Sequence, residues 1–176
     1  ITLKRVFNLV GKDPLRYYMI STKSETAMDF NIDKVTEKNK DNPVFYCQYA
    51  FARSSSVIRK ANTQINFNLN DNLFDKFLIS SISDFEWQII IKILIWPHIL
   101  EQAAITKQPH RITIYLEDLC SNFHTFWNKG KDDESLRFID ENDLNKTISK
   151  LIWIESFRKI LKQIFSIIGI EAPETM

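Results

Sequence analysis

Glycine and proline are scarce in this chain, with three and five copies among 176 residues. Turn-rich β architectures need both residues at their tight turns, so the scarcity favours helices. A glycine-rich loop that binds phosphates is excluded on the same ground, because such a loop needs several glycines by itself. The two cysteines, Cys47 and Cys120, are far apart and form neither a metal nor a redox motif. We therefore expect a helical protein without a disulfide scaffold.

Side chains that carry out catalysis are also few. The only histidines are His98, His110 and His124. They lack the spacing, with one another or with acidic neighbours, that metal ligands show on a helix. The run of serines at 54–56 has no neighbouring base, and adjacent carboxylates such as those at 117–118 point in different directions on a helix. The sequence therefore predicts neither catalytic residues nor a metal site.

No strong charge of one sign and no long apolar run is present. The formal net charge is +1, but residues 132–143 carry six carboxylates against one arginine, a net −5, which leaves +6 for the remainder. This segregation allows a local basic surface. The longest apolar run, from Ile89 to Leu100, is interrupted and too short to span a bilayer, and no secretory signal is visible. We expect a cytoplasmic protein without a membrane partner, and the first residue, Ile1, suggests a fragment of a longer chain.

The most informative stretch is the predicted helix that begins at Pro43 and runs through Ala61. Asp41 or Asn42 can cap it, and Pro43 suits a first helical position. At about 100° per residue the helix has two faces. The predicted buried face holds Val44, Cys47, Phe51, Ser54, Ile58 and Ala61. The other face holds Tyr46, Tyr49, Arg53, Ser56 and Lys60. Phenols and cations in one row can stack on a base and hold a phosphate, although surface tyrosines more often pack against a neighbouring helix.

Further helices are predicted from apolar periodicity and end signals. The expected bounds are 14–21 with Asp13 as its cap, a short helix at 73–78, 84–104 behind a Ser83/Glu86 capping box with a kink at Pro97, 111–129 ended by Gly130, and 144–168 ended by Gly169. Residues 1–12 give little signal, residues 23–40 and 62–72 read as irregular, and 131–143 as a loop with a little helix. Together they predict an all-α, up-and-down helical bundle.

Four segments resemble the C-terminal DALR anticodon-binding domain of class I arginyl-tRNA synthetases. Residues 42–53, N-P-V-F-Y-C-Q-Y-A-F-A-R, are similar to the family's N-P-V-Y-Y-V-Q-Y-A-H-A-R, with Phe51 in place of His. Residues 13–16, D-P-L-R, resemble the D-A-L-R element, with Pro14 in place of Ala. The segments 109–119 and 168–176 also resemble family segments. The H-I-G-H and K-M-S-K-S signatures of the catalytic domain are absent.

The resemblance implies a function and a set of site residues. Residues 1–40 would connect to, and pack on, a catalytic domain, and residues 41–176 would form the anticodon-binding bundle. The partner would be the anticodon loop of tRNA-Arg, and the parent arginine–tRNA ligase would use ATP and Mg in its catalytic domain, so this chain alone would be inactive. The implied tRNA-binding residues are Tyr46, Tyr49, Arg53, Lys60, Trp127 and Met176.

Two alternatives remain open at this point. The tyrosine and arginine face could dock a partner protein in a helical interaction domain without an RNA role. The bundle could also belong to another synthetase, such as the glycyl enzyme. Trp127 could equally be a core residue, and a terminal residue such as Met176 is disordered by default.

Overall fold

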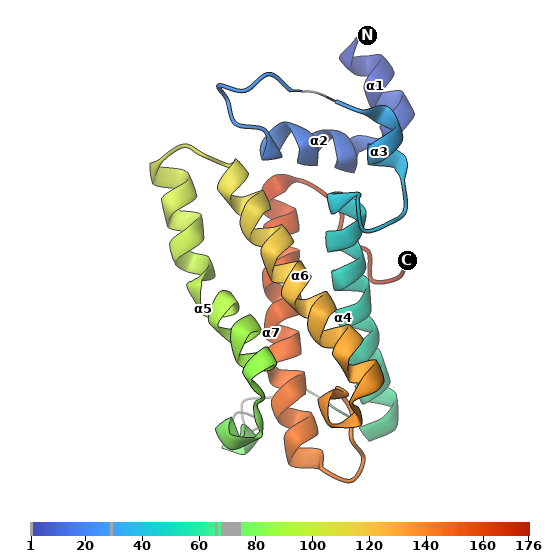
Figure 1. Ribbon diagram of the computed structural model, residues 1–176, viewed down its shortest axis with the longest axis vertical. Coiled ribbons are helices and arrows are strands. Elements are labelled where there is room, and N and C mark those ends of the chain that lie inside the picture. Colours follow the sequence, from blue (N-terminus) through green and yellow to red (C-terminus); the bar gives the residue numbers. More distant parts are fainter. Residues whose placement is uncertain (1, 29, 66, 68–74) are drawn as a thin grey trace.

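Four long helices stand side by side and alternate in direction in the computed structural model, which describes residues 2–28, 30–65, 67 and 75–176 (Figure 1). They are α4 (Pro43–Ile65), α5 (Asp84–Ile105), α6 (His110–Asp132) and α7 (Leu144–Ile168). Three shorter helices, α1 (Leu3–Val10), α2 (Lys12–Ser21) and α3 (Ile32–Thr36), lie at one end. Two 3-10 turns, η2 (Ile79–Ser81) and η3 (Glu134–Leu136), lie near the other end. The described residues contain no strand, so the predicted all-α, up-and-down bundle is confirmed.

Helix ends form where side chains satisfy the free backbone groups. The Asn42 Oδ1 accepts from the N–H groups of Val44 and Phe45 at 3.2 and 3.4 Å, which caps α4 as predicted. The Ser83/Glu86 capping box opens α5. Gly169 ends α7 at φ 74°, a left-handed conformation that glycine adopts without strain.

The bundle core is rich in aromatic rings from α4, α6 and α7. The rings of Phe123 and Phe157 stack with centroids 4.6 Å apart, and Phe51 meets Phe165 edge to face at 5.9 Å. Most of the predicted buried face of α4 is buried, while Ile58 is half-buried against the core. Burying such large rings supplies much of the hydrophobic stabilisation of a domain of this size.

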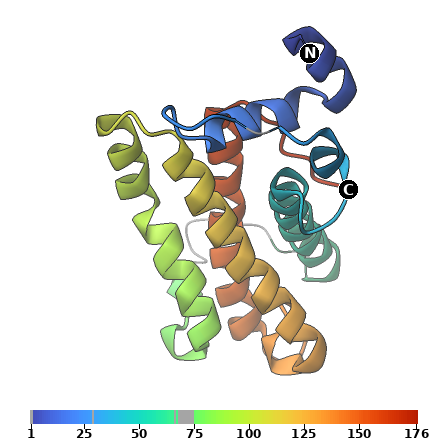
Figure 2. The same ribbon diagram turned by 45° about the horizontal axis from the view of Figure 1, so that its top comes forward.

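Helix α2 packs across one end of the bundle (Figure 2). Its Tyr17 is fully buried and donates a hydrogen bond to Glu117 Oε1 on α6 at 2.6 Å. By contrast, α1 has no buried residue. The proposed division at residue 40 stays a prediction, and α2 belongs physically to the bundle core.

Two local expectations were wrong. Gly130 does not end α6, which continues to Asp132. Asp13 is not a cap, because α2 begins one residue earlier, at Lys12. Helix α5 includes Pro97 within its length, and the expected kink there stays a prediction. Helices α1 and α3 were not predicted, and α4 extends into the expected 62–72 loop; residues 68–74 of that loop and of the short 73–78 helix lie outside the described residues.

Helix α5 is long and apolar enough, by length and composition alone, to cross a membrane. In the structure its Ile89, Ile93 and Trp96 are buried against the rest of the bundle. Only 22% of its most apolar window is buried, but one such helix is weak evidence for a membrane span.

Candidate nucleic-acid interface

The guanidinium of Arg53 lies between two aromatic rings at the junction of α4 and α6. Its central carbon is 4.1 Å from the ring centre of Tyr49 and 5.0 Å from that of Trp127. Arg53 Nη2 also donates to the Tyr49 hydroxyl at 3.1 Å, across one helical turn. Cation–π contacts of this kind hold an otherwise flexible side chain in one place. The three side chains therefore form one ordered, partly exposed platform.

His124 of α6 holds this platform in place through both of its ring nitrogens. Its Nε2 faces the backbone carbonyl of Tyr46 at 3.0 Å, and a carbonyl can only accept, so Nε2 carries the proton. Its Nδ1 is then free to accept from Arg53 Nη1, also at 3.0 Å. Burial, with a smaller effect of the Arg53 charge, lowers the pKa of His124 to about 4, although the hydrogen bond with Tyr46 acts in the opposite direction. The imidazole is therefore neutral at physiological pH.

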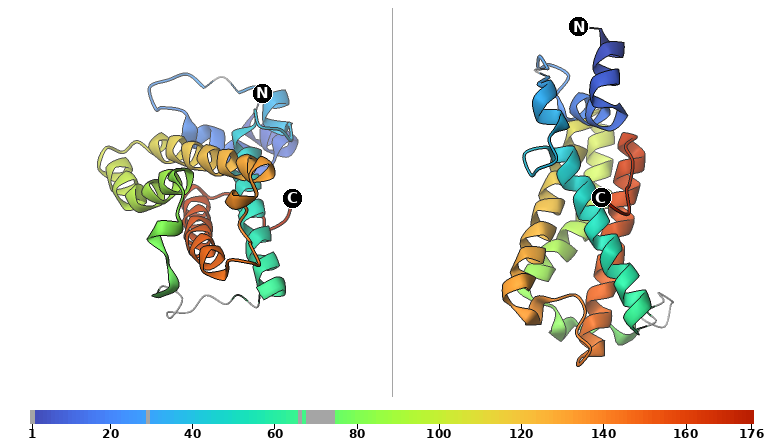
Figure 3. Two further views of the ribbon diagram at one scale, coloured as in Figure 1. Left: turned by 60° about the horizontal axis from the view of Figure 1, so that its bottom comes forward. Right: turned by 90° about the vertical axis from the view of Figure 1, so that its right-hand side faces the viewer.

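A cavity of about 400 Å³ opens above the platform. Tyr49, Arg53 and Trp127 line one part of it, and the C-terminal end of the chain lines the other. The full lining is Tyr49, Ala52, Arg53, Ser56, Arg59, Trp127, Glu174, Thr175 and Met176. The chain's last residues reach this place because they run from α7 to the outer side of α4 (Figure 3, right). An aromatic, cationic and thioether lining suits a flat, partly polar ring.

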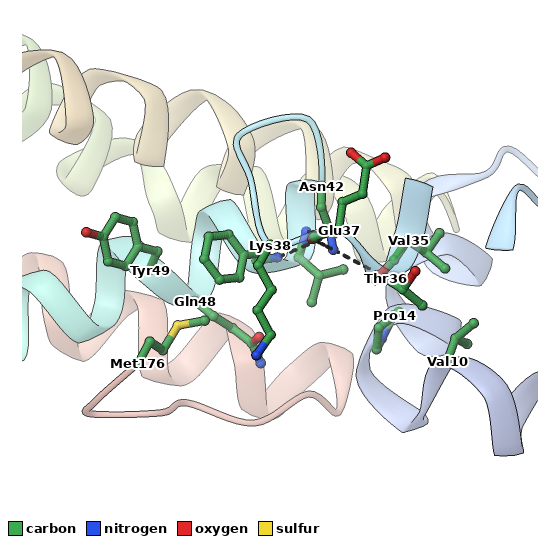
Figure 4. Close-up of a pocket in the computed structure, with 12 residues that line it drawn as sticks. Val10, Pro14, Val35, Thr36, Glu37, Lys38, Asn42, Gln48, Tyr49 and Met176 are labelled. Carbon is green, nitrogen blue, oxygen red and sulfur yellow. Dashed lines mark hydrogen bonds between the residues drawn. The ribbon is translucent and has the colours of Figure 1, made fainter. Parts of the chain in front are cut away.

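A second and larger cavity, of about 760 Å³, lies on the other side of Met176 (Figure 4). Tyr49 and Met176 line both cavities, so they separate them. The far walls come from α3 and from the beginning of α4, with Val35, Val44 and Phe45 as apolar members. Phe45 also stacks on Tyr49, with centroids 5.8 Å apart.

Tyr46 does not share a cavity with Tyr49. Its ring packs on His124, with centroids 4.2 Å apart, and faces a separate groove. That groove is lined by Lys40, Asp41, Pro43, Tyr46, Ile114, Glu117, Asp118 and Ser121. Desolvation raises the pKa of the Tyr46 phenol. Three carboxylates beside one lysine make this groove a poor place for a phosphate.

The structure thus brings four of the six predicted tRNA-binding residues to one cavity: Tyr49, Arg53, Trp127 and Met176. Lys60 is exposed and lines the adjacent cavity, next to Trp127 and Ser56. Trp127 is half-buried, since it packs on Phe123 and Phe138 but keeps one face toward Arg53. Its part in the core and its exposure in the cavity are therefore compatible.

Sequence reasoning considered His124 only as a metal ligand and missed its place in this cluster. The available signal was the spacing of His124 and Trp127, three residues apart on the predicted 111–129 helix, which puts them on one face. Which helix that face meets was not readable from the spacing. Among the residues that the structure describes, no group of three His, Cys, Asp or Glu side chains could hold a metal ion.

Comparisons with known proteins identify relatives of this chain. Curated arginine–tRNA ligases of Bartonella bacilliformis and Agrobacterium fabrum are 43% and 39% identical over the whole chain, which spans about 30% of their length. A Campylobacter jejuni structure described as an arginyl-tRNA synthetase is 27% identical with a TM-score of 0.79, over all of this chain and 36% of that one. The structure of Thermus thermophilus arginyl-tRNA synthetase shares the fold, with 22% identity and a TM-score of 0.75. The match covers 96% of this chain and 27% of that one.

A family model described as the DALR anticodon binding domain matches residues 47–176. This range holds α4 from Cys47 onward, all of α5 to α7, and Tyr49, Arg53, Trp127 and Met176 of the cavity. The chain therefore belongs to the DALR anticodon-binding domain family.

Proposed function

We propose that this chain binds the anticodon loop of tRNA-Arg and is the anticodon-binding part of an arginine–tRNA ligase. The observation that carries the proposal is the cavity between Tyr49, Arg53, Trp127 and Met176. Proteins read single-stranded RNA loops by stacking unpaired bases on aromatic rings and on guanidinium planes. The cavity offers both surfaces within 5.0 Å of each other.

The cationic residues around the cavity have two roles in this proposal. Arg53 is held against Tyr49 and His124, so it presents a fixed donor surface to a base edge. Arg59 lines the same cavity, and Lys60 is exposed beside it, where each can meet the phosphate of a neighbouring nucleotide. Phosphate contacts position the loop, whereas contacts to the base carry sequence information.

Tyr46 acts indirectly in this proposal. Its ring and its carbonyl both support His124, which in turn holds Arg53. The groove in front of Tyr46 is acidic, so a base stacked there would bring its phosphates near three carboxylates. We therefore expect Tyr46 to contribute less to RNA binding than Tyr49.

The remaining parts of the proposal concern the whole enzyme. We infer that the full protein joins arginine to its tRNA in the cytoplasm with ATP and Mg, and that no residue described in this chain takes part in that chemistry. We further infer that the catalytic domain packs on residues 1–40. The exposed apolar side chains of α1, Leu3, Phe7 and Leu9, support this packing, because such a surface is costly to leave in water.

The test is Tyr49→Ala in this chain, measured by binding of an anticodon stem-loop of tRNA-Arg. Removing one stacking ring should weaken binding by about 1–3 kcal/mol, which is about 5- to 150-fold. The melting temperature should change little, because Tyr49 is only half-buried. Phe85→Ala, which removes a similar half-exposed ring from α5, is the matched control and should leave binding unchanged. A Tyr49→Ala protein that is less stable but binds RNA normally once folded would contradict the proposal.

Two further measurements separate the alternatives. Affinity should fall steeply with salt if phosphates are bound, because their counterions are released. Exchange of the middle anticodon base should weaken binding, whereas indifference to that base would favour another synthetase or non-specific binding. Absence of any RNA affinity at low salt would favour a protein-docking role.

A further inference from the structure

The last residues of the chain, 170–176, are held along α4 by polar contacts from three different helices. We call this segment the C-terminal tail. Ile170 is buried and its N–H donates to Phe165 O at 3.0 Å, which completes the turn after α7. Beyond it, the tail follows the outside of α4 to Met176 (Figure 3). A free chain end is normally disordered unless specific contacts hold it.

Asp13 makes the first of these contacts. Its Oδ2 accepts from the Glu171 N–H at 3.0 Å and from Gln48 Nε2 at 2.8 Å. The same Gln48 amide donates to Glu171 O at 3.0 Å. One carboxylate oxygen thus ties together α2, α4 and the tail, three parts that are far apart in the sequence. Hydrogen bonds to an ionised carboxylate are about twice as strong as those between neutral groups.

Arg16, one turn after Asp13 on α2, holds the end of α7 from which the tail starts. Its Nε donates to Ile168 O at 3.0 Å, where the end of α7 leaves carbonyl groups without a helical partner. A Cβ at Gly169 would collide with the same guanidinium. Gly169 is therefore needed both for its left-handed conformation and for the close approach of Arg16.

Two arginines hold the far part of the tail. Arg59 on α4 donates to Glu174 O at 3.0 Å, and Arg158 on α7, which also pairs with Glu155, lies 3.5 Å from Glu174 Oε1. The tail is therefore fixed at residues 171 and 174, and Met176 follows two residues later. In Figure 4 the Met176 side chain lies beside Gln48 and Tyr49.

We propose that Asp13 and Arg16 of α2 are positioning residues for the RNA cavity, because they hold the C-terminal tail so that Met176 forms one of its walls. The D-P-L-R segment would then act on RNA without contacting it. The position of α2 and the position of Met176 would be linked through the tail. The proposal deepens the proposed function, on which its RNA consequence rests, whereas the tail contact itself can be measured without RNA.

The first measurement is the methyl signal of Met176 in methionine-labelled protein without RNA. The chain has three methionines, and Met176→Leu assigns the one of interest. In Asp13→Ala we expect the Met176 methyl signal to become sharper and to move to the chemical shift of a mobile chain end. Asp13→Asn keeps an oxygen that can accept from the Glu171 N–H and should leave the signal near its wild-type position. An unchanged Met176 signal in Asp13→Ala would overturn the proposal.

The second measurement is a double-mutant cycle with the anticodon stem-loop. Asp13→Ala and Met176→Ala should each weaken binding by about 3- to 10-fold, from loss of the thioether contact, and the double variant should be no weaker than either one. Additive losses would show that Asp13 acts on RNA by another route and would overturn the proposal. If Tyr49→Ala and Met176→Ala both leave RNA binding unchanged, the proposed function fails, and the methyl signal still decides the tail contact.

Gln48→Ala is a second variant, which tests the proposal even where Asp13→Ala does not fold. It removes the two amide contacts to Asp13 and Glu171 but leaves the core intact, since Gln48 is only half-buried. We expect a smaller shift of the Met176 methyl in the same direction. A wild-type methyl position in this variant, with the melting temperature unchanged, would count against the proposal.

Discussion

At the scale of single residues, His124 is the group on which the cavity geometry depends. Its two ring nitrogens face an acceptor on one side, the Tyr46 carbonyl, and a donor on the other, the Arg53 guanidinium. Only a neutral imidazole with its proton on Nε2 satisfies both partners. Protonation would bring a second cation against Arg53, and burial adds to that cost.

This environment predicts a pH dependence of stability. The folded pKa of His124 is about 4, below the unfolded value of 6.5, so between these values the unfolded chain binds the proton more readily. The unfolding free energy should therefore fall as the pH decreases from about 6.5 to 4, and the share of His124 is about 2 kcal/mol between pH 7 and pH 4.5. Urea unfolding should show that His124→Gln loses less unfolding free energy over this pH range than the wild type does.

The control for this prediction is His98→Gln, because His98 is exposed on α5. It should keep the wild-type loss of stability on acidification. Equal pH dependence in the wild type and in His124→Gln would mean that His124 does not titrate abnormally in the folded protein.

At the scale of elements, a buried lysine stabilises the loop between α6 and α7 by hydrogen bonds. Lys150 of α7 is almost fully buried, and its ammonium donates to Ser135 O at 2.8 Å and to Arg137 O at 2.7 Å. These carbonyls belong to η3 and its end, the part of the acidic segment that folds back on α6. Burial lowers the pKa of Lys150 to about 8, although nearby carboxylates such as Glu86 partly offset it.

The lysine contact predicts a stability change on the alkaline side. The folded pKa of about 8 lies below the unfolded value of 10.5, so the unfolded chain binds more protons between them. The unfolding free energy should therefore rise between pH 8 and about 9.5, by on the order of 1 kcal/mol after allowance for solvent screening. Lys150→Met should abolish this rise and speed amide exchange in residues 133–139. Lys146→Met, one turn earlier on α7, is the control and should retain the rise.

The helix ends show which local signals suffice. Asn42, the Ser83/Glu86 box and Gly169 act through neighbours within four residues, so each was readable from the sequence. Gly130 lies inside α6, which ends at Asp132, so the glycine signal alone did not locate the helix end. Asp13 was misread as a cap because its partners, Gln48 and Glu171, are distant in the sequence.

At the scale of the whole molecule, the exposed face of α1 predicts self-association of the isolated chain. Leu3 and Phe7 are 58% and 46% exposed, and none of the helix is buried. Replacing both with serine should reduce light scattering at high protein concentration, because it removes apolar surface that two copies can share. The melting temperature and the stem-loop affinity should stay at wild-type values. Leu144→Ser, at an exposed position on α7, is the control and should not reduce scattering.

The residue pattern by itself determined the helical class, the face of α4 that enters the core and the pairing of Tyr49 with Arg53. All of these depend on periodicity or on neighbours one turn apart, which a single helix defines. Only the tertiary structure decided how the predicted tRNA-binding residues are grouped. His124 of α6 separates Tyr46 from Tyr49, and contacts from Asp13, Gln48 and Arg59 bring Met176 to the cavity. The contacts of His124 with Arg53 and of the tail with Asp13, Gln48 and Arg59 join residues more than 70 positions apart. Their geometry depends on how whole helices pack, which no local pattern contains.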